Sequence, residues 1–144
     1  MVRIWLLILF LDLVSSRLFQ IKDLEDPPPK DPNSIRISII GDSITEWNVW
    51  PRELDRLIGS NNVEIGNFAV SGATISLNRT PSPRLRPYRF TDKWEIFKKS
   101  QPDIIIFMLG SCDAKWDNWQ ANSIENFESE YGGWLKYLKG FNRT

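Results

Sequence analysis

The stretch IRISIIGDSIT, residues 35–45, decides how the rest of the chain is interpreted. Its first six residues are rich in β-branched isoleucine and the apolar run stops at Gly41, which predicts a strand buried in a sheet. A brief apolar alternation over residues 63–68 and an apolar run over residues 104–109 follow later in the chain, each before a small residue. The second of these is apolar throughout, as expected of a central parallel strand that is covered on both faces. The sequence therefore predicts three buried strands.

Helical patterns separate these strands. Residues 51–58 begin with proline and precede Gly59, which is suited to a left-handed cap, and residues 92–99 form a second short helix. A third helix is predicted to start near Asn122, with Glu125 three residues later as a capping-box partner. Alternation of strands and helices predicts an α/β fold with a parallel sheet and right-handed crossovers.

The composition suits one globular domain and argues against two classes of partner, nucleic acid and anionic membranes. The chain has 144 residues, 42% of them hydrophobic, and its 18 basic and 18 acidic residues cancel. We therefore expect neither nucleic acid nor an anionic membrane surface as a partner. The chain contains no histidine, the commonest general base and the commonest metal ligand. No metal site and no cofactor are predicted.

The N-terminus has the pattern of a signal peptide over residues 1–16, with Arg3 before a short apolar run and small residues before the expected cleavage point. The run is too short for a membrane span, so we expect a secreted protein or one in the lumen of the secretory pathway. Residues 17–33 are interpreted as a Pro-rich segment and residues 34–144 as the domain. Two Asn-x-Thr sequons make Asn78 and Asn142 candidates for glycosylation.

Ligands of open α/β sheets bind outside the carboxyl ends of the strands, so the segments that follow the strands are where a site is expected. These segments are residues 41–46, 67–74 and 110–115. We expect them to converge on one edge of the sheet. A phosphate site is disfavoured, because neither a G-x-G-x-x-G pattern nor a Walker-type lysine is present.

The three segments, in this order and each after a predicted strand, resemble the named blocks of the SGNH or GDSL-type ester hydrolases over residues 35–119. Short stretches such as residues 70–74 resemble most the branch of carbohydrate O-acetylesterases. The resemblance implies that Ser43 is the nucleophile and that the backbone N–H groups of Ser43 and Gly72 help form the oxyanion hole. The alternatives are a Ser43 hydroxyl that caps the following turn and an ordinary tight turn at Gly72.

The chain departs from this family at two places. Cys112 stands where the family has an asparagine whose amide is the third oxyanion donor, and a thiol is a weak donor. The family's Asp-x-x-His segment, which supplies the base, is missing. Asp113 and Lys115 are not expected to replace the base, and Cys112 is expected to be a small buried thiol rather than a reactive one.

Two further groups of residues are open to a functional reading. Four tryptophans near the strand ends either stack on sugar rings or pack within the protein; they are Trp47, Trp50, Trp116 and Trp119. The arginine-rich residues 78–89 form an irregular loop in this interpretation, which either binds a carboxylate or is simply solvated. Asp42 and Thr45 are interpreted as turn formers.

The fold predicted from these observations is a flavodoxin-like three-layer α/β/α sandwich with a parallel sheet of about three strands. We expect it to be truncated at the C-terminal side, as in a fragment or short form, with an exposed sheet edge. The predicted function is that of an ester hydrolase lineage acting on a small-molecule or carbohydrate ester, inactive in this chain. The alternative is a secreted, non-catalytic carbohydrate- or ligand-binding protein. The sequence leaves the oligomeric state open.

Overall fold

The computed structural model describes residues 18–20, 26–77, 84–115 and 124–141. The predicted signal peptide and both predicted glycosylation sites, Asn78 and Asn142, lie outside these residues. They remain predictions. Among the described residues, no helix is both long and apolar enough to cross a membrane.

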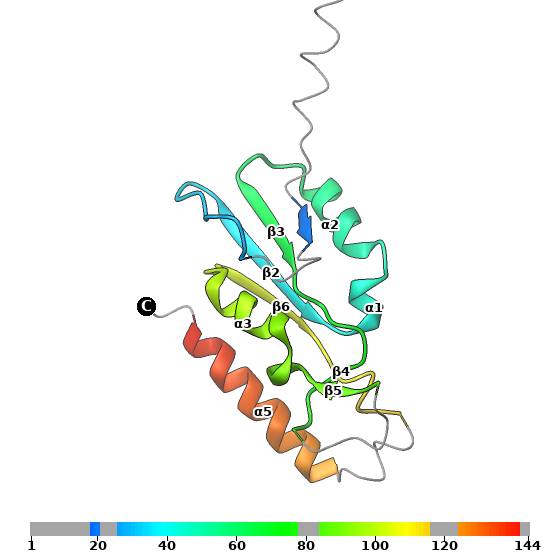
Figure 1. The fold of residues 1–144 in the computed structure, drawn as a ribbon. Coiled ribbons are helices and arrows are strands. Elements are labelled where there is room, and N and C mark those ends of the chain that lie inside the picture. The colour runs from blue at the N-terminus through cyan, green and yellow to red at the C-terminus, as the bar shows by residue number, and fades with distance from the viewer. Residues whose placement is uncertain (1–17, 21–25, 78–83, 116–123, 142–144) are drawn as a thin grey trace, which may run out of the picture.

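The main sheet is parallel and has the strand order β1-β3-β2-β6 (Figure 1). Its strands are β1 (Leu18–Gln20), β2 (Ile35–Gly41), β3 (Val63–Asn67) and β6 (Ile104–Met108). The last three confirm the predicted strands. Strand β1 was not predicted, and it lies within the segment interpreted as a Pro-rich tether.

The three predicted strands lie in the order second, first, third, which is how a flavodoxin-like sheet begins. In this order the chain leaves β2 toward one neighbour and later returns to the other side of β2. The carboxyl ends of β2 and β6 therefore flank the point at which the strand order reverses. Ligands of such sheets bind at this point.

Helices cover both faces of the sheet (Figure 1). Helices α1 (Ser43–Glu46) and α2 (Trp50–Ile58) lie on one side, and α3 (Asp92–Lys99) and α5 (Ile124–Phe141) lie on the other. Helices α2, α3 and α5 confirm the three predicted helices, and Gly59 takes the left-handed conformation expected of a cap, with φ 53°. The three-layer α/β/α arrangement is confirmed.

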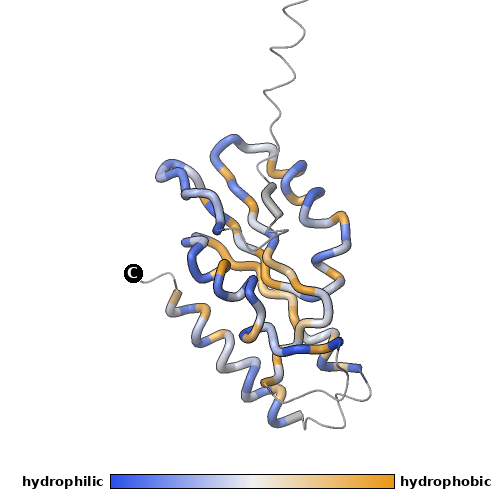
Figure 2. The backbone as a smooth tube through the Cα atoms, viewed as in Figure 1, coloured by the Kyte–Doolittle hydropathy of each residue, from blue (hydrophilic) through white to orange (hydrophobic). Residues whose placement is uncertain are grey.

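Two apolar clusters hold the layers together. The smaller one packs α2 against one face of the sheet, and the larger, aromatic one packs α3 and α5 against the other. Figure 2 shows the apolar residues gathered in the central strands. The smaller cluster is built on Ile37, Ile39 and Ile65, and the larger one includes Phe68, Tyr88, Trp94, Phe97 and Trp134.

Strand β6 is the end of the sheet in the described structure, not a central strand. Ile105 and Phe107 pack on the aromatic cluster and Ile106 packs on the smaller cluster, but Ile104 and Met108 are 47% and 45% exposed. Both faces of β6 are thus contacted, but the prediction of a central strand is wrong for the described sheet, because it rested on the apolar run alone. The prediction of an exposed apolar edge is confirmed.

The arginine-rich segment is more ordered than predicted where it is described. Strand β5 (Arg86–Pro87) pairs in parallel with β4 (Ala73–Thr74), and the 3-10 helix η1 (Tyr88–Phe90) follows. The Tyr88 side chain is fully buried and its hydroxyl donates to the carbonyl of Phe68 at 2.7 Å. This part of the segment therefore supports the loop that follows β3.

Candidate active site

The segments after β2 and β6 meet at the carboxyl edge of the sheet, as predicted. Gly41 ends β2 and pairs with Met108 at the end of β6. Beyond this pair, the hydroxyl of Ser111 in the loop after β6 donates to the carboxylate of Asp42, which is only 1% exposed. The candidate nucleophile Ser43 therefore follows a carboxylate that the β6 loop holds in place.

Asp42, and not Ser43, caps the short helix α1. Its Oδ1 accepts the N–H of Ile44 at 3.0 Å, and its carbonyl accepts the N–H groups of Thr45 and Glu46 at 3.0 and 2.9 Å. The interpretation of Asp42 as a turn former is thus confirmed. Thr45 is fully buried and its hydroxyl has no hydrogen-bond partner among the described residues, so its side chain does not form the turn.

Glu46 joins α1 to the loop that follows β3. Its Oε2 accepts the N–H of Ser71 at 2.7 Å, and its Oε1 lies 3.5 Å from Nζ of Lys93. The same ammonium group donates to the carbonyl of Ala69 at 3.0 Å. A carboxylate at the end of the Ser43 helix therefore fixes the backbone immediately before Gly72.

Gly72 occupies a position that only glycine fits. Its φ is +77°, and a Cβ at this position would lie 2.2 Å from the carbonyl oxygen of Arg84. Its own carbonyl accepts the N–H of Arg86 at 3.1 Å. The close approach at Gly72 is therefore made by the protein's own β5 segment, which accounts for the glycine. The oxyanion role of its N–H stays a prediction.

Cys112 is a buried thiol, as predicted. It is 1% exposed, and burial raises its pKa, an effect that the nearby Lys115 opposes only in part. Such a thiol is protonated near neutral pH and is a poor nucleophile. Its assignment as a substituted oxyanion donor stays a prediction.

Asp113 has a structural role. Its two carboxylate oxygens accept the N–H groups of Ile75 and Ser76, both at 2.9 Å, and the residue is buried. Burial raises its pKa against the lowering effect of these two hydrogen bonds. The carboxylate thus links the β6 loop to the segment after β4, and it is not directed to solvent as a free base would be.

A shallow depression of about 390 Å³ lies beside Ser43 and is lined by Ser43, Ile44, Trp47, Asn48 and Val49. Trp47 is 76% exposed, so packing does not account for its ring. Trp50, by contrast, packs on the smaller apolar cluster. Trp116 and Trp119 lie outside the described residues.

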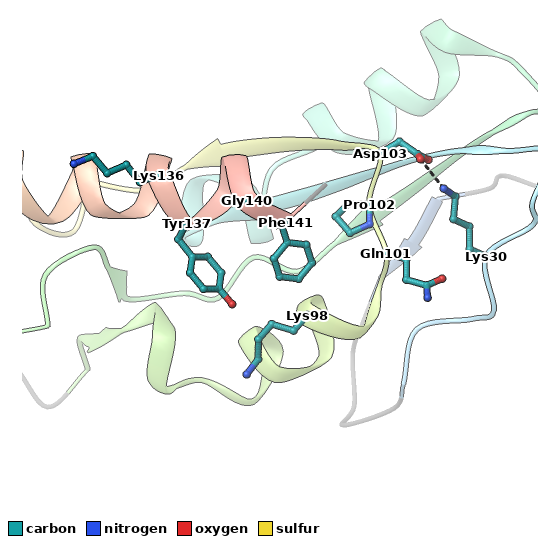
Figure 3. A pocket seen from close by; sticks show the side chains of 9 residues that line it. All are labelled: Lys30, Lys98, Gln101, Pro102, Asp103, Lys136, Tyr137, Gly140 and Phe141. Atoms are coloured by element: carbon teal, nitrogen blue, oxygen red, sulfur yellow. Dashed lines mark hydrogen bonds and ion pairs between the residues drawn. The ribbon is translucent and has the colours of Figure 1, made fainter. Parts of the chain in front are cut away.

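A larger cavity, of about 970 Å³, is shown in Figure 3. It opens between the last turns of α3 and α5 and is lined by Lys98, Tyr137 and Phe141, with Lys30 paired to Asp103 at 2.6 Å. Asp103 immediately precedes β6, so this cavity is at the amino ends of the strands. It contains none of the predicted site residues.

Comparison with known proteins gives one informative match. The chain is 31% identical over 121 residues to an acetylxylan esterase of Xylanibacter ruminicola. The chain resembles an esterase. The match covers 78% of this chain and 23% of that protein, so the chain spans less than a quarter of this relative's length. No family model matches the chain, and no solved structure matches it significantly.

Three residues that shape the site were not singled out from the sequence: Ser111, Glu46 and Lys93. The contact of Ser111 with Asp42 depends on how β6 lies beside β2. Glu46 and Lys93 are 47 residues apart, and only the packing of α3 under the β3 loop brings them together. No local pattern signals either contact.

Proposed function

We propose that this chain belongs to an SGNH or GDSL-type ester hydrolase lineage whose substrate is an O-acetyl ester of a carbohydrate. The observation that carries the proposal is the position of Ser43. It starts α1 directly after the central strand β2, on the rim of a depression, at the point where the strand order reverses. The similarity to an acetylxylan esterase supports the same lineage.

The chemistry of this lineage is acyl transfer through Ser43. The Ser43 hydroxyl attacks the acetyl carbonyl, its proton passes to a base and then to the departing sugar oxygen, and acetyl-Ser43 remains. Water then releases acetate. Backbone N–H groups of Ser43 and Gly72 are proposed to stabilise the tetrahedral oxygen, with Cys112 at the position of a third donor.

The chain itself is proposed to be inactive, because the residues that the structure describes around Ser43 offer it no free general base. The chain contains no histidine. The Asp42 carboxylate already accepts from Ile44 and Ser111, and both oxygens of Asp113 accept backbone N–H groups. A serine hydroxyl without a base is a weak nucleophile at neutral pH.

Chemical rescue tests this proposal. In the presence of p-nitrophenyl acetate and millimolar imidazole, which supplies the missing base, the intact mass of the protein should show one acetyl adduct on Ser43. Without imidazole the adduct should be absent, and Ser43→Ala should show none under either condition. Equal acetylation of the wild type and Ser43→Ala in imidazole would refute the assignment.

The same assay examines Cys112. If this residue occupies a degraded donor position, Cys112→Asn should raise the imidazole-dependent rate of Ser43 acetylation by at least about tenfold, since one such donor is worth about 2.7–4 kcal/mol in subtilisin. Cys112→Ser, which adds a hydroxyl donor of similar size, is the matched variant. An unchanged rate in Cys112→Asn, with the fold intact, would count against this role.

A second function is a secreted carbohydrate-binding protein that has lost the chemistry. The exposed Trp47 beside Ser43 favours it, since a binding surface needs no base. Secretion is itself part of the proposal and rests on residues 1–16. Expression in a secreting host followed by N-terminal sequencing should find a mature chain that begins near residue 17. Retention of Met1 in the secreted product would contradict it.

A further inference from the structure

The depression beside Ser43 carries an apolar surface that packing does not account for. Ile44, Trp47 and Val49 are all exposed, lie within a stretch of six residues and line the depression together with Ser43 and Asn48. Exposed aromatic and aliphatic groups that gather in one place usually mark a contact surface. Elsewhere in the described structure the tryptophans Trp94 and Trp134 are buried.

We infer that Trp47 is the stacking platform for a pyranose ring of the substrate, placed next to the nucleophile position. This inference rests on the proposed function, and it names the residue that would hold the alcohol portion of the ester. An indole ring presents a flat apolar face, which suits the C–H face of a sugar. Asn48, on the same depression, carries an amide that suits the hydroxyl groups at the rim of a sugar.

Local hydrogen bonds fix the position of Trp47 relative to Ser43. The N–H of Trp47 donates to the carbonyl of Ser43 at 3.1 Å, so Trp47 ends the single turn that Ser43 begins. Asn48 accepts the N–H of Val49 at 2.7 Å, which orders the backbone after the ring. The platform is thereby tied to the turn that carries the candidate nucleophile.

The shape of the depression favours a saccharide over a long acyl chain. Its volume of about 390 Å³ lies at the lower end of the range for small-molecule pockets, about 300–1,000 Å³. All five of its lining residues come from the single stretch 43–49, so it is a surface feature and not a tunnel. The relative that the chain matches is named for an acetylated polysaccharide, which is built of such rings.

The test is titration of the full chain with xylohexaose, followed by calorimetry and by the indole N–H signals in NMR spectra. We expect saturable binding, weakened about tenfold or more by Trp47→Ala and largely restored by Trp47→Phe, which keeps an aromatic face. Leu57→Ala is the matched control, because Leu57 is a similarly exposed apolar residue on α2. It should leave binding unchanged.

The outcomes separate this inference from the proposed function. Acetylation of Ser43 in imidazole tests the proposed function, whereas saccharide binding by the wild type and by Trp47→Ala tests this inference. Absence of binding, or binding that Trp47→Ala leaves unchanged, overturns the inference even if Ser43 is acetylated in imidazole. Concentration-dependent dimerisation that Trp47→Ala abolishes, without saccharide binding, would also overturn it and would assign the patch to a second copy of the chain.

Discussion

Replacing Gly72, in the loop that carries the proposed oxyanion N–H, by alanine should destabilise the protein. The structure gives the expected loss in the free energy of unfolding. The left-handed backbone at φ +77° costs about 1–2 kcal/mol for a residue with a Cβ. The new Cβ would also lie 2.2 Å from a backbone oxygen, that of Arg84, which must move. Overpacking of this kind costs about 1–3 kcal/mol. The sum is about 2–5 kcal/mol in the free energy of unfolding.

Gly59 provides the matched control. It has a similar φ of +53°, but a Cβ there would lie 3.6 Å from its nearest neighbour, the carbonyl of Arg56, which is ordinary contact. Gly59→Ala should therefore lose only the backbone contribution, about 1–2 kcal/mol. Gly132, inside α5 with open space around it, should tolerate or gain from alanine by about 0.5–1 kcal/mol.

Urea denaturation followed by circular dichroism measures all three variants. With a slope of about 1–3 kcal/mol per molar urea, the midpoint of Gly72→Ala should fall by about 1 M or more. The midpoint of Gly59→Ala should fall by less. The reasoning is refuted if Gly72→Ala is no less stable than Gly59→Ala, since the contact with the Arg84 carbonyl would then carry no cost.

Three further predictions follow from buried groups. Alkylation of Cys112 by iodoacetamide at pH 8 should be slow in the native protein and fast in urea, because burial raises its pKa and blocks access; equal rates would contradict its burial. Burial acts to raise the pKa of Glu64, but hydrogen bonds from Arg36 and Ser34 outweigh it and lower the pKa below 4.5. Its contribution to stability is therefore present above about pH 4.5 and is lost as the pH falls through the lower native value. Glu64→Gln should flatten the stability profile in that acid range, and an unchanged profile would argue against the pairing. Tyr88→Phe should lower the free energy of unfolding by about 1–2 kcal/mol, because the Phe68 carbonyl loses a buried donor at 2.7 Å; no loss in chemical denaturation would contradict this.

The parts of the fold that local patterns determine could be predicted from the sequence. The isoleucine-rich run before Gly41 gave β2, and proline before a helix with Gly59 after it gave α2 to within one residue. The parallel sheet followed from the alternation of strands and helices. Burial of Cys112 was predicted because a free cysteine behaves as a small hydrophobic residue.

The parts that depend on long-range packing could not be predicted. An apolar run does not say whether both faces of β6 are covered, because that depends on which segments lie beside it. Polar composition suggested a solvated loop around Tyr88, although its ring is a buried member of the aromatic cluster. The reason for Gly72 also differs from the expected one, since the approaching group is the carbonyl of Arg84. Such contacts join residues that are far apart in the sequence, and no local sequence pattern reveals them.

The most direct test of the central claim is the rate at which a fluorophosphonate labels Ser43 in the wild-type chain without imidazole. The claim is that Ser43 keeps the place of an esterase nucleophile but has no base in this chain. Labelling, followed by intact mass and peptide mapping, should therefore be no faster than the background of Ser43→Ala. Rapid, stoichiometric labelling of Ser43 would contradict the claim and would show that the chain activates this serine by itself.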